Sequence, residues 1–345
     1  MSPGSGAPAG EGAQASDPSG LIRQYRAARQ GAILADRSDL GRLAVRGKDA
    51  LDLLHRLTTN SIKTLQPGEG TAAVFATAKG RILDLVSFLL LEDHLLCLTG
   101  PGRAAAIRDW IERYTFREEV QVEDLQASHG TLWIFGAGAA RLVAARWGEE
   151  RARRPLHYGS PVGPEGAGAV LARTWPLAGE GFHLSAERGA LPGLRERLAQ
   201  GGDAPVPAGE ECLEVLRIEA GLPAAWRELT EEYNPWEARL DDAISLTKGC
   251  YVGQEVIARL NTYKKVSKLL VRIALEGERA PAVPAALWRE RESIGTLTSA
   301  ARVPGEARIV GLGYVRDELA IEGRELRVAP DQGPELEGVV LGIAR

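Results

Sequence analysis

A thiol, an ammonium group and two glycines lie close together in residues 248–253, which read K-G-C-Y-V-G. Cys250 is expected near the start of a helix and beside Lys248, and both a helix N-terminus and a nearby cation favour a thiolate. The alternative is a buried structural cysteine before an ordinary helix, because free cysteine is often part of the core. The helix is predicted from apolar side chains that follow with the spacing of one helix face: Val256, Ile257 and Leu260.

The pattern K-G-C-Y-x-G-Q-E followed by A-R extends over residues 248–259. It resembles the signature of the YgfZ-type folate-binding proteins, which are relatives of the glycine-cleavage T protein (aminomethyltransferase). The resemblance implies that Cys250 takes part in the chemistry. It also implies that tetrahydrofolate or a derivative is the cofactor, and that three residues of this pattern contribute to its binding: Lys248, Tyr251 and Arg259.

Residues 217–223 read R-I-E-A-G-L-P and are predicted to end a helix that begins near Gly209. They resemble the R-x-E-x-G stretch of the T-protein superfamily, in which the glutamate recognises the pterin of tetrahydrofolate. A pterin presents adjacent amino and ring N–H donors, and a carboxylate accepts both. The resemblance therefore implies that Glu219 binds the cofactor. The alternative is a glutamate in a last helical turn that faces water, where an acid is mildly unfavourable.

Residues 79–85 read K-G-R-I-L-D-L and resemble the T protein's G-G-I-x-D-D segment, whose acids act near the reactive nitrogens of folate. The resemblance implies that Asp84 is a catalytic residue. The alternative is an aspartate that ends a strand or hairpin. Leu85 fills the place of the second acid and Arg81 replaces a glycine, and both departures argue against aminomethyl transfer. Residues 58–61, T-T-N-S, resemble the family's T-T-N-D segment, but we interpret them as a polar helix C-cap.

The hydrophobic pattern predicts a mixed α+β body, because helices and local hairpins follow one another without a regular βαβ alternation. After residue 260 the pattern changes to short strands with turn residues between them, which predicts a small C-terminal β-barrel. Two of these strands, residues 293–299 and 309–315, resemble the G-x-x-T-S and I-x-L-x-Y-V strands of the superfamily's barrel. The resemblance implies a multi-domain T-protein-like body around a central folate site.

These patterns divide the chain into three parts. Residues 1–20 are rich in Gly, Ala, Ser and Pro and predict a disordered tail. Residues 21–262 form the predicted folate-binding body, with a break between two subdomains near residues 148–168, which are rich in Gly, Pro and Arg. Residues 263–345 form the predicted barrel.

Composition narrows the class of protein further. The chain has 345 residues, of which 44% are hydrophobic, and a net charge of −4, so it predicts a large core and argues against direct nucleic-acid binding. The longest apolar run, residues 85–91, is too short to cross a bilayer, so no membrane role is expected. No C-x-x-C pair is present, so the sequence supports neither a metal site nor a disulfide framework. We expect reduced thiols in the cytoplasm at Cys97, Cys212 and Cys250.

Three functions follow from the resemblance and its departures. The first is a folate-binding accessory protein that assembles or maintains iron–sulfur clusters, with indirect effects on tRNA modification, so that iron–sulfur proteins are expected partners. The second is a folate-dependent aminomethyltransferase or methyltransferase. The third is a non-catalytic scaffold that docks partners through the Cys250 loop. Glu219 favours the first two, and the single Asp84 favours the first over the second. Whether a reaction is catalysed stays open.

Overall fold

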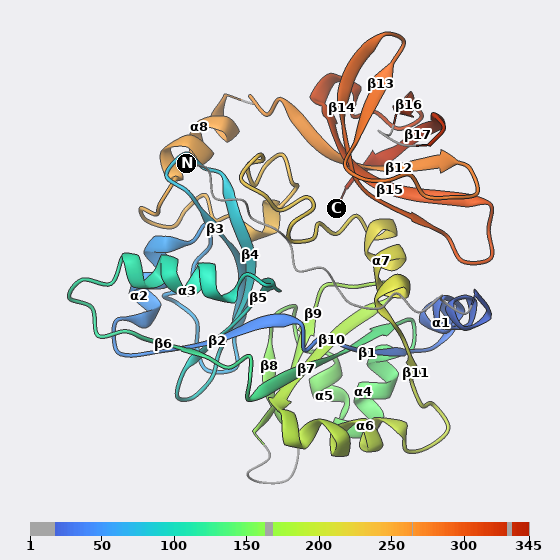
Figure 1. Cartoon of the computed structure of the whole chain (residues 1–345). Helices are drawn as coiled ribbons and strands as arrows, with labels where there is room; N and C mark the ends of the chain where they lie inside the picture. The colour runs from blue at the N-terminus through green and yellow to red at the C-terminus, as the bar shows by residue number, and fades with distance from the viewer. Residues whose placement is uncertain (1–17, 163–167, 264, 330–332, 345) are drawn as a thin grey trace.

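The computed structural model describes residues 18–162, 168–263, 265–329 and 333–344. Figure 1 shows three lobes: a five-stranded sheet with its helices in blue and cyan, a six-stranded sheet with its helices that is mostly green with a blue strand β1, and a closed barrel in orange and red. The predicted α+β body with a C-terminal β-barrel is confirmed. No helix within the described ranges is long and apolar enough to cross a membrane.

The first lobe contains a sheet of strand order β3-β4-β5-β2-β6. Its strands are β2 (Leu40–Arg46), β3 (Gly70–Ala76), β4 (Ile82–Leu90), β5 (Leu95–Pro101) and β6 (Gln121–Asp124). The helices α2 (Ala50–Leu57) and α3 (Ala104–Arg113) pack on it through a common core that includes Leu53, Phe75 and Ile107. Burial alternates along the first part of β4, as expected for a strand with one face in a core.

The second lobe contains a sheet of strand order β11-β1-β7-β10-β9-β8. Its strands are β1 (Ile33–Asp36), β7 (His129–Gly136), β8 (Gly159–Val162), β9 (Ala169–Thr174), β10 (Glu180–Glu187) and β11 (Val206–Pro207). A separate core, which includes Leu142, Phe182 and Leu198, joins this sheet to its helices. These helices are α4 (Ala139–Trp147), α5 (Glu149–Ala152) and α6 (Leu191–Ala199).

The predicted break near residues 148–168 contains α5 and β8, and β8 belongs to the same sheet as β7. The chain changes sheets earlier, between the end of β6 at Asp124 and the start of β7 at His129. Glycine and proline mark a loop, but they do not tell a loop inside one lobe from a connection between two lobes.

Three helices lie outside the two sheet lobes. They are α1 (Pro18–Gln30), α7 (Glu210–Glu219) and α8 (Gln254–Thr262). Helix α7 contacts both α1 and the barrel, and its apolar side chains belong to the largest core, which joins the body to the barrel. Of the predicted disordered tail, residues 1–17 lie outside the described residues, whereas Pro18 begins helix α1.

The barrel closes in the order β12-β15-β14-β13-β16-β17. Its strands are β12 (Lys268–Glu276), β13 (Ala285–Arg289), β14 (Glu292–Arg302), β15 (Arg308–Arg316), β16 (Glu325–Ala329) and β17 (Leu336–Ile343). The sequence pattern missed β13. Gly295 in β14 is required for close strand approach, because a Cβ at this position would lie 1.9 Å from the carbonyl oxygen of Tyr314.

Candidate functional site

The loop that precedes α8 is fastened to the C-terminal end of α2. Lys248 Nζ donates to the backbone carbonyls of Thr58 and Asn60, both at 2.7 Å, and also to the carbonyl of His55. The Ser245 N–H donates to the Thr59 carbonyl at 2.9 Å. Carbonyls at a helix C-terminus carry partial negative charge, so an ammonium group is well placed there.

The Lys248 ammonium group has a structural role in this geometry, and its contribution to cofactor binding stays a prediction. An ammonium group has three N–H donors, and three protein carbonyls accept them. Lys248 thus anchors the loop instead of facing the Cys250 thiol. Burial lowers the pKa of Lys248 to about 7, whereas the three carbonyls favour its protonated form.

Tyr251 and Arg259, the other two residues implied in cofactor binding, have contrasting surroundings. The Tyr251 ring is 8% exposed and packs in a small core with Trp236 and Ile257. Burial raises its pKa to about 12. Arg259 lies on the exposed side of α8. The structure therefore gives Tyr251 a packing role and leaves only Arg259 of this pair on the surface.

Cys250 is exposed, whereas Cys97 and Cys212 are buried. Burial raises the pKa of both buried thiols, that of Cys212 to about 11. Cys250, expected near the helix start, lies outside the first turn, because α8 begins at Gln254 after an N-cap at Gly253. The helix N-terminus therefore does not explain a reactive thiol at Cys250.

Gly253 is the position at which the loop requires glycine. Its φ of 82° lies in the left-handed region, and a Cβ there would lie 2.5 Å from the Thr77 carbonyl oxygen. The start of α8 is thus packed tightly on the β3–β4 turn, in which Gly80 also approaches Val256. Together with the Lys248 contacts, this packing fixes the position of the exposed Cys250.

Thr58 and Thr59 show why the T-T-N-S segment is polar. Thr58 is the C-cap of α2 and its hydroxyl donates to the Leu54 carbonyl at 2.8 Å, which confirms the predicted helix C-cap. The Thr59 hydroxyl donates to the Ala243 carbonyl at 2.6 Å and accepts from the Val74 N–H at 2.9 Å. The segment thus joins α2, β3 and the loop before α8.

Glu219 lies at the end of α7, where α1 and the barrel meet it. Its carboxylate accepts from Arg29 Nη2 at 2.5 Å and from the Tyr25 hydroxyl at 2.9 and 3.0 Å. Arg308 in β15 approaches its other oxygen at 3.4 Å. Burial and the Glu219 charge raise the pKa of Tyr25 to about 12. A pterin that binds Glu219 must therefore displace at least one of these protein donors.

Asp84 lies in β4 and is completely buried. Its Oδ2 accepts the Gly100 N–H at 2.8 Å, whereas its Oδ1 is buried without a hydrogen-bond partner among the residues described. Burial raises the pKa of Asp84 to about 7, against the opposing effects of the Gly100 N–H and the positive charge of Arg103. A carboxyl group with a pKa near neutrality is suited to proton transfer.

Arg103 and Trp226 form a stacked pair next to Asp84. The Arg103 guanidinium carbon lies 3.5 Å from the Trp226 ring centroid, and Arg103 Nη2 donates to the Leu229 carbonyl at 3.2 Å. The Trp226 indole N–H donates to the Pro101 carbonyl at 2.7 Å. Arg103 Nε is buried and has no hydrogen-bond partner in the described part of the chain. The region thus holds an unpaired buried donor and an unpaired buried acceptor.

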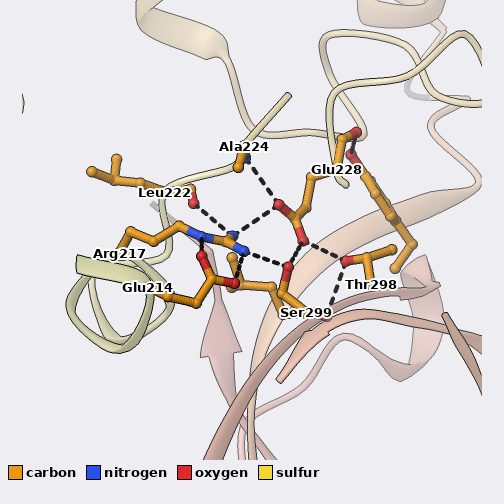
Figure 2. Close-up of polar contacts among 9 residues, drawn as sticks. Glu214, Arg217, Leu222, Ala224, Glu228, Thr298 and Ser299 are labelled. Atoms are coloured by element: carbon orange, nitrogen blue, oxygen red, sulfur yellow. Dashed lines mark hydrogen bonds and ion pairs between the residues drawn. The ribbon is translucent and has the colours of Figure 1, made fainter. Parts of the chain in front are cut away.

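A buried ion pair fixes the loop that carries Trp226. Figure 2 shows the Arg217 guanidinium between two carboxylates. Arg217 Nη1 lies 2.9 Å from Glu228 and also donates to the Leu222 carbonyl, and its other donors are directed to Glu214 and Ser299. Glu228 is 0% exposed, and its carboxylate also accepts from the Ala224 N–H and from the hydroxyls of two barrel residues, Thr298 and Ser299. Both oxygens of the Glu228 carboxylate therefore have two hydrogen-bond or ion-pair partners each.

The same ion pair connects the barrel to the candidate site. Glu228 lies two residues after Trp226, and its backbone carbonyl accepts the Tyr314 hydroxyl at 2.9 Å. The Tyr314 ring stacks on Tyr233 with centroids 3.4 Å apart. The barrel strands thus contact the loop that carries Trp226, and this contact connects the T-S sequence at 298–299 to the candidate site.

The predicted site residues fall in three places. Cys250 lies on the loop over α2, Glu219 on α7, and Asp84 inside the first lobe. No hydrogen bond or ion pair between described residues joins these three side chains. No group of His, Cys, Asp and Glu that could hold a metal ion occurs in the ranges that the structure describes.

Sequence reasoning missed Arg103, Trp226 and Glu228. No local motif marks Arg103, which follows Pro101 and Gly102 at the start of a helix. Trp226 and Glu228 follow the R-I-E-A-G-L-P segment closely, so the continuation of that segment was the available signal.

Comparison with known proteins defines the family. The family model of the GCVT N-terminal domain matches residues 13–248. A chloroplastic protein of Arabidopsis thaliana, named as a putative transferase, is 30% identical over 320 residues, which cover 90% of this chain and 70% of the relative. An aminomethyltransferase of Rubrobacter xylanophilus is 30% identical over 303 residues, which cover 87% of this chain and 80% of the relative.

The fold comparison agrees with these matches. The crystal structure of the glycine cleavage system aminomethyltransferase T from Bartonella henselae superposes with a TM-score of 0.81. It covers 94% of this chain and 91% of that chain, with 22% sequence identity, and so shows a shared fold. The chain belongs to the GCVT N-terminal domain family, and the predicted relationship to the glycine-cleavage T-protein superfamily is confirmed.

Proposed function

We propose that this protein binds tetrahydrofolate or a derivative at Asp84. The observation that carries the proposal is Asp84 Oδ1, the one buried side-chain oxygen without a hydrogen-bond partner among the described residues. Buried polar atoms are nearly always paired, so this oxygen calls for a partner from outside the chain. A pterin carries N–H donors, which match this acceptor. Membership of the T-protein superfamily supports folate as the ligand.

Glu219 is the second residue proposed to bind the pterin, through the charged pairing described for the superfamily. Glu219→Gln replaces one acceptor oxygen with a donor and removes the charge that holds Arg29 and Tyr25. We expect tetrahydrofolate affinity to fall roughly ten- to a hundred-fold, which corresponds to about 1.5–3 kcal/mol. Isothermal titration calorimetry on the folded variant measures this affinity.

Arg29→Ala is the matched control, because it removes a partner of Glu219 and keeps the carboxylate. If the pterin displaces Arg29, this variant should bind tetrahydrofolate at least as tightly as the wild type. If Glu219→Gln binds tetrahydrofolate as tightly as wild type, Glu219 does not bind the pterin and Asp84 alone recognises it.

We further propose that the folate-bound protein assists the assembly or maintenance of iron–sulfur clusters in the cytoplasm and affects tRNA modification indirectly. The K-G-C-Y-x-G-Q-E motif supports this role, because it places an exposed cysteine on a loop that is fixed at both ends. A fixed, accessible thiol is suited to contact with a partner protein or its cluster. Iron–sulfur proteins are the proposed partners.

Cys250→Ser tests the thiol in this role. The substitution exchanges sulfur for oxygen on an exposed loop, so we expect unfolding free energy within about 0.5 kcal/mol of wild type and unchanged folate affinity. In cells that lack the protein, the variant should fail to restore iron–sulfur enzyme activity, whereas Cys212→Ser at a buried position should restore it if it folds. Full restoration by Cys250→Ser would remove the thiol from the mechanism.

Aminomethyl transfer is the second candidate function. The sequence relatives of Rubrobacter xylanophilus and Streptomyces coelicolor are aminomethyltransferases, and the raised pKa of Asp84 suits a proton-transfer role. Leu85 argues against it, because it packs against the core where the T protein has its second acid. Retained ligand binding alone does not accelerate a reaction. An assay with a lipoyl-carried aminomethyl donor distinguishes the two functions.

A further inference from the structure

We propose that the solvent-exposed face of Trp226 is the surface on which the planar ring of the ligand stacks, and that Arg103 is the positioning residue that holds the indole there. This inference rests on the proposed folate function and deepens it. It assigns ring recognition to a residue outside the motifs that the chain shares with its superfamily.

The indole of Trp226 is fixed on one side and open on the other. The Arg103 guanidinium lies against one face, 3.5 Å from the ring centroid, and the indole N–H is bonded to the Pro101 carbonyl. Half of the residue nevertheless remains exposed. An aromatic ring that is already oriented loses little freedom when a second ring stacks on it, so it makes an efficient contact surface.

The backbone of Trp226 supports a role other than folding. Its φ of 66° lies in the left-handed region, which disfavours a bulky side chain and favours glycine. Such strained residues occur mostly at binding and catalytic sites, where the surrounding structure enforces them. Here the enforcing contacts are the buried Glu228 carboxylate, which binds the Ala224 N–H, and the indole hydrogen bond to Pro101.

The stacking surface adjoins the unpaired oxygen of Asp84. A Cβ placed on Gly100 would lie 2.5 Å from the Cβ of Ala225, the residue before Trp226, and 3.1 Å from Asp84 Oδ1. The unpaired oxygen of Asp84 therefore faces the contact between Gly100 and Ala225. A ring on the open face of Trp226 lies opposite Arg103, and an edge of that ring that carries N–H donors can pair with Asp84 Oδ1. The planar pyrimidinone half of a reduced pterin carries such donors.

Trp226→Gly provides the sharpest test, because it separates binding from folding. Glycine accepts the left-handed backbone, which offsets part of the loss of the indole contacts, so urea denaturation should show a variant that still folds cooperatively. Calorimetric titration with tetrahydrofolate should show affinity weaker by roughly ten-fold or more, as stacking contacts on aromatic side chains generally contribute. Trp226→Phe keeps a ring and should bind within about three-fold of wild type, while ligand-dependent quenching of indole fluorescence should decrease.

Phe116→Ala is the matched control, because it removes another exposed aromatic side chain, 82% accessible, from the first lobe. It should change neither affinity nor quenching. If Trp226→Gly binds tetrahydrofolate as tightly as wild type, the ligand does not stack on Trp226, whereas the proposed folate function stands. If the variant does not fold, full quenching in Trp226→Phe overturns the inference instead. A folded wild type that does not bind tetrahydrofolate overturns the proposed function and this inference with it.

Discussion

Replacing Glu228 with alanine is expected to lower the free energy of unfolding by about 3–5 kcal/mol. The reason is that Arg217, which is 9% exposed, would remain buried with one of its two carboxylate partners removed. The Ala224 N–H and the Ser299 hydroxyl would lose their acceptor as well. Urea denaturation followed by circular dichroism measures the loss.

Glu292→Ala is the matched control on the same barrel. Its ion pair with Arg316 is exposed, with 66% of the Glu292 side chain accessible, so its removal should leave the stability close to that of wild type. An equally small loss of stability in Glu228→Ala would show that the buried network does not hold the barrel to the body. Because the network also fixes the Trp226 loop, Glu228→Ala should lose ligand affinity under conditions in which it remains folded.

The second large effect is a dependence of stability on pH that Asp84 causes. Its pKa in the folded protein is about 7, against an ordinary value of 3.8 in the unfolded chain. Between these values the folded protein holds a proton that the unfolded chain has released. The stabilising contribution is therefore fully present below about pH 4 and is lost as the pH rises to about 7. From pH 5 to pH 8 the loss amounts to about 2–3 kcal/mol.

Asp84→Asn should remove this dependence, because the amide does not titrate. The difference in unfolding free energy between variant and wild type should therefore shift in favour of the variant on going from pH 5 to pH 8, and other titrating groups cancel in the comparison. Asp36→Asn is the control: the pKa of Asp36 is lowered through hydrogen bonds to Ser38 and the charge of Arg195, so its contribution changes only in acid. Equal pH profiles for wild type and Asp84→Asn would show that Asp84 is ionised throughout this range.

Local patterns in the sequence predicted the elements that carry the motifs, and longer-range contacts decided what those motifs do. The apolar spacing after Cys250 predicted a helix, and α8 follows, because that signal depends on residues within two turns. The direction of the Lys248 side chain depends on the end of α2, 188 to 193 residues earlier in the chain. Proximity along the chain therefore predicted a thiol–ammonium pair that the folded chain does not form.

The sequence did not reveal the contact between Arg103 and Trp226 for the same reason. The indole and its Pro101 acceptor are 125 residues apart in the chain, so neither residue alone indicates the contact. The role of Glu228 depends likewise on Thr298, 70 residues later. By contrast, the T-T-N-S segment could be interpreted correctly as a helix C-cap, since the Thr58 hydroxyl meets a carbonyl only four residues away.

Calorimetric titration of the full chain with tetrahydrofolate tests the central claim, which is that the unpaired oxygen of Asp84 beside Trp226 receives a reduced pterin. The account predicts saturable binding at one site, a marked loss of affinity in Asp84→Asn, and no competition from p-aminobenzoylglutamate, which lacks the pterin. Asp84→Asn keeps an acceptor for Gly100 and places an amide donor opposite the ligand's N–H, so the loss is expected without unfolding. Absence of saturable binding in the folded wild type, or equal affinity in Asp84→Asn, would contradict the account.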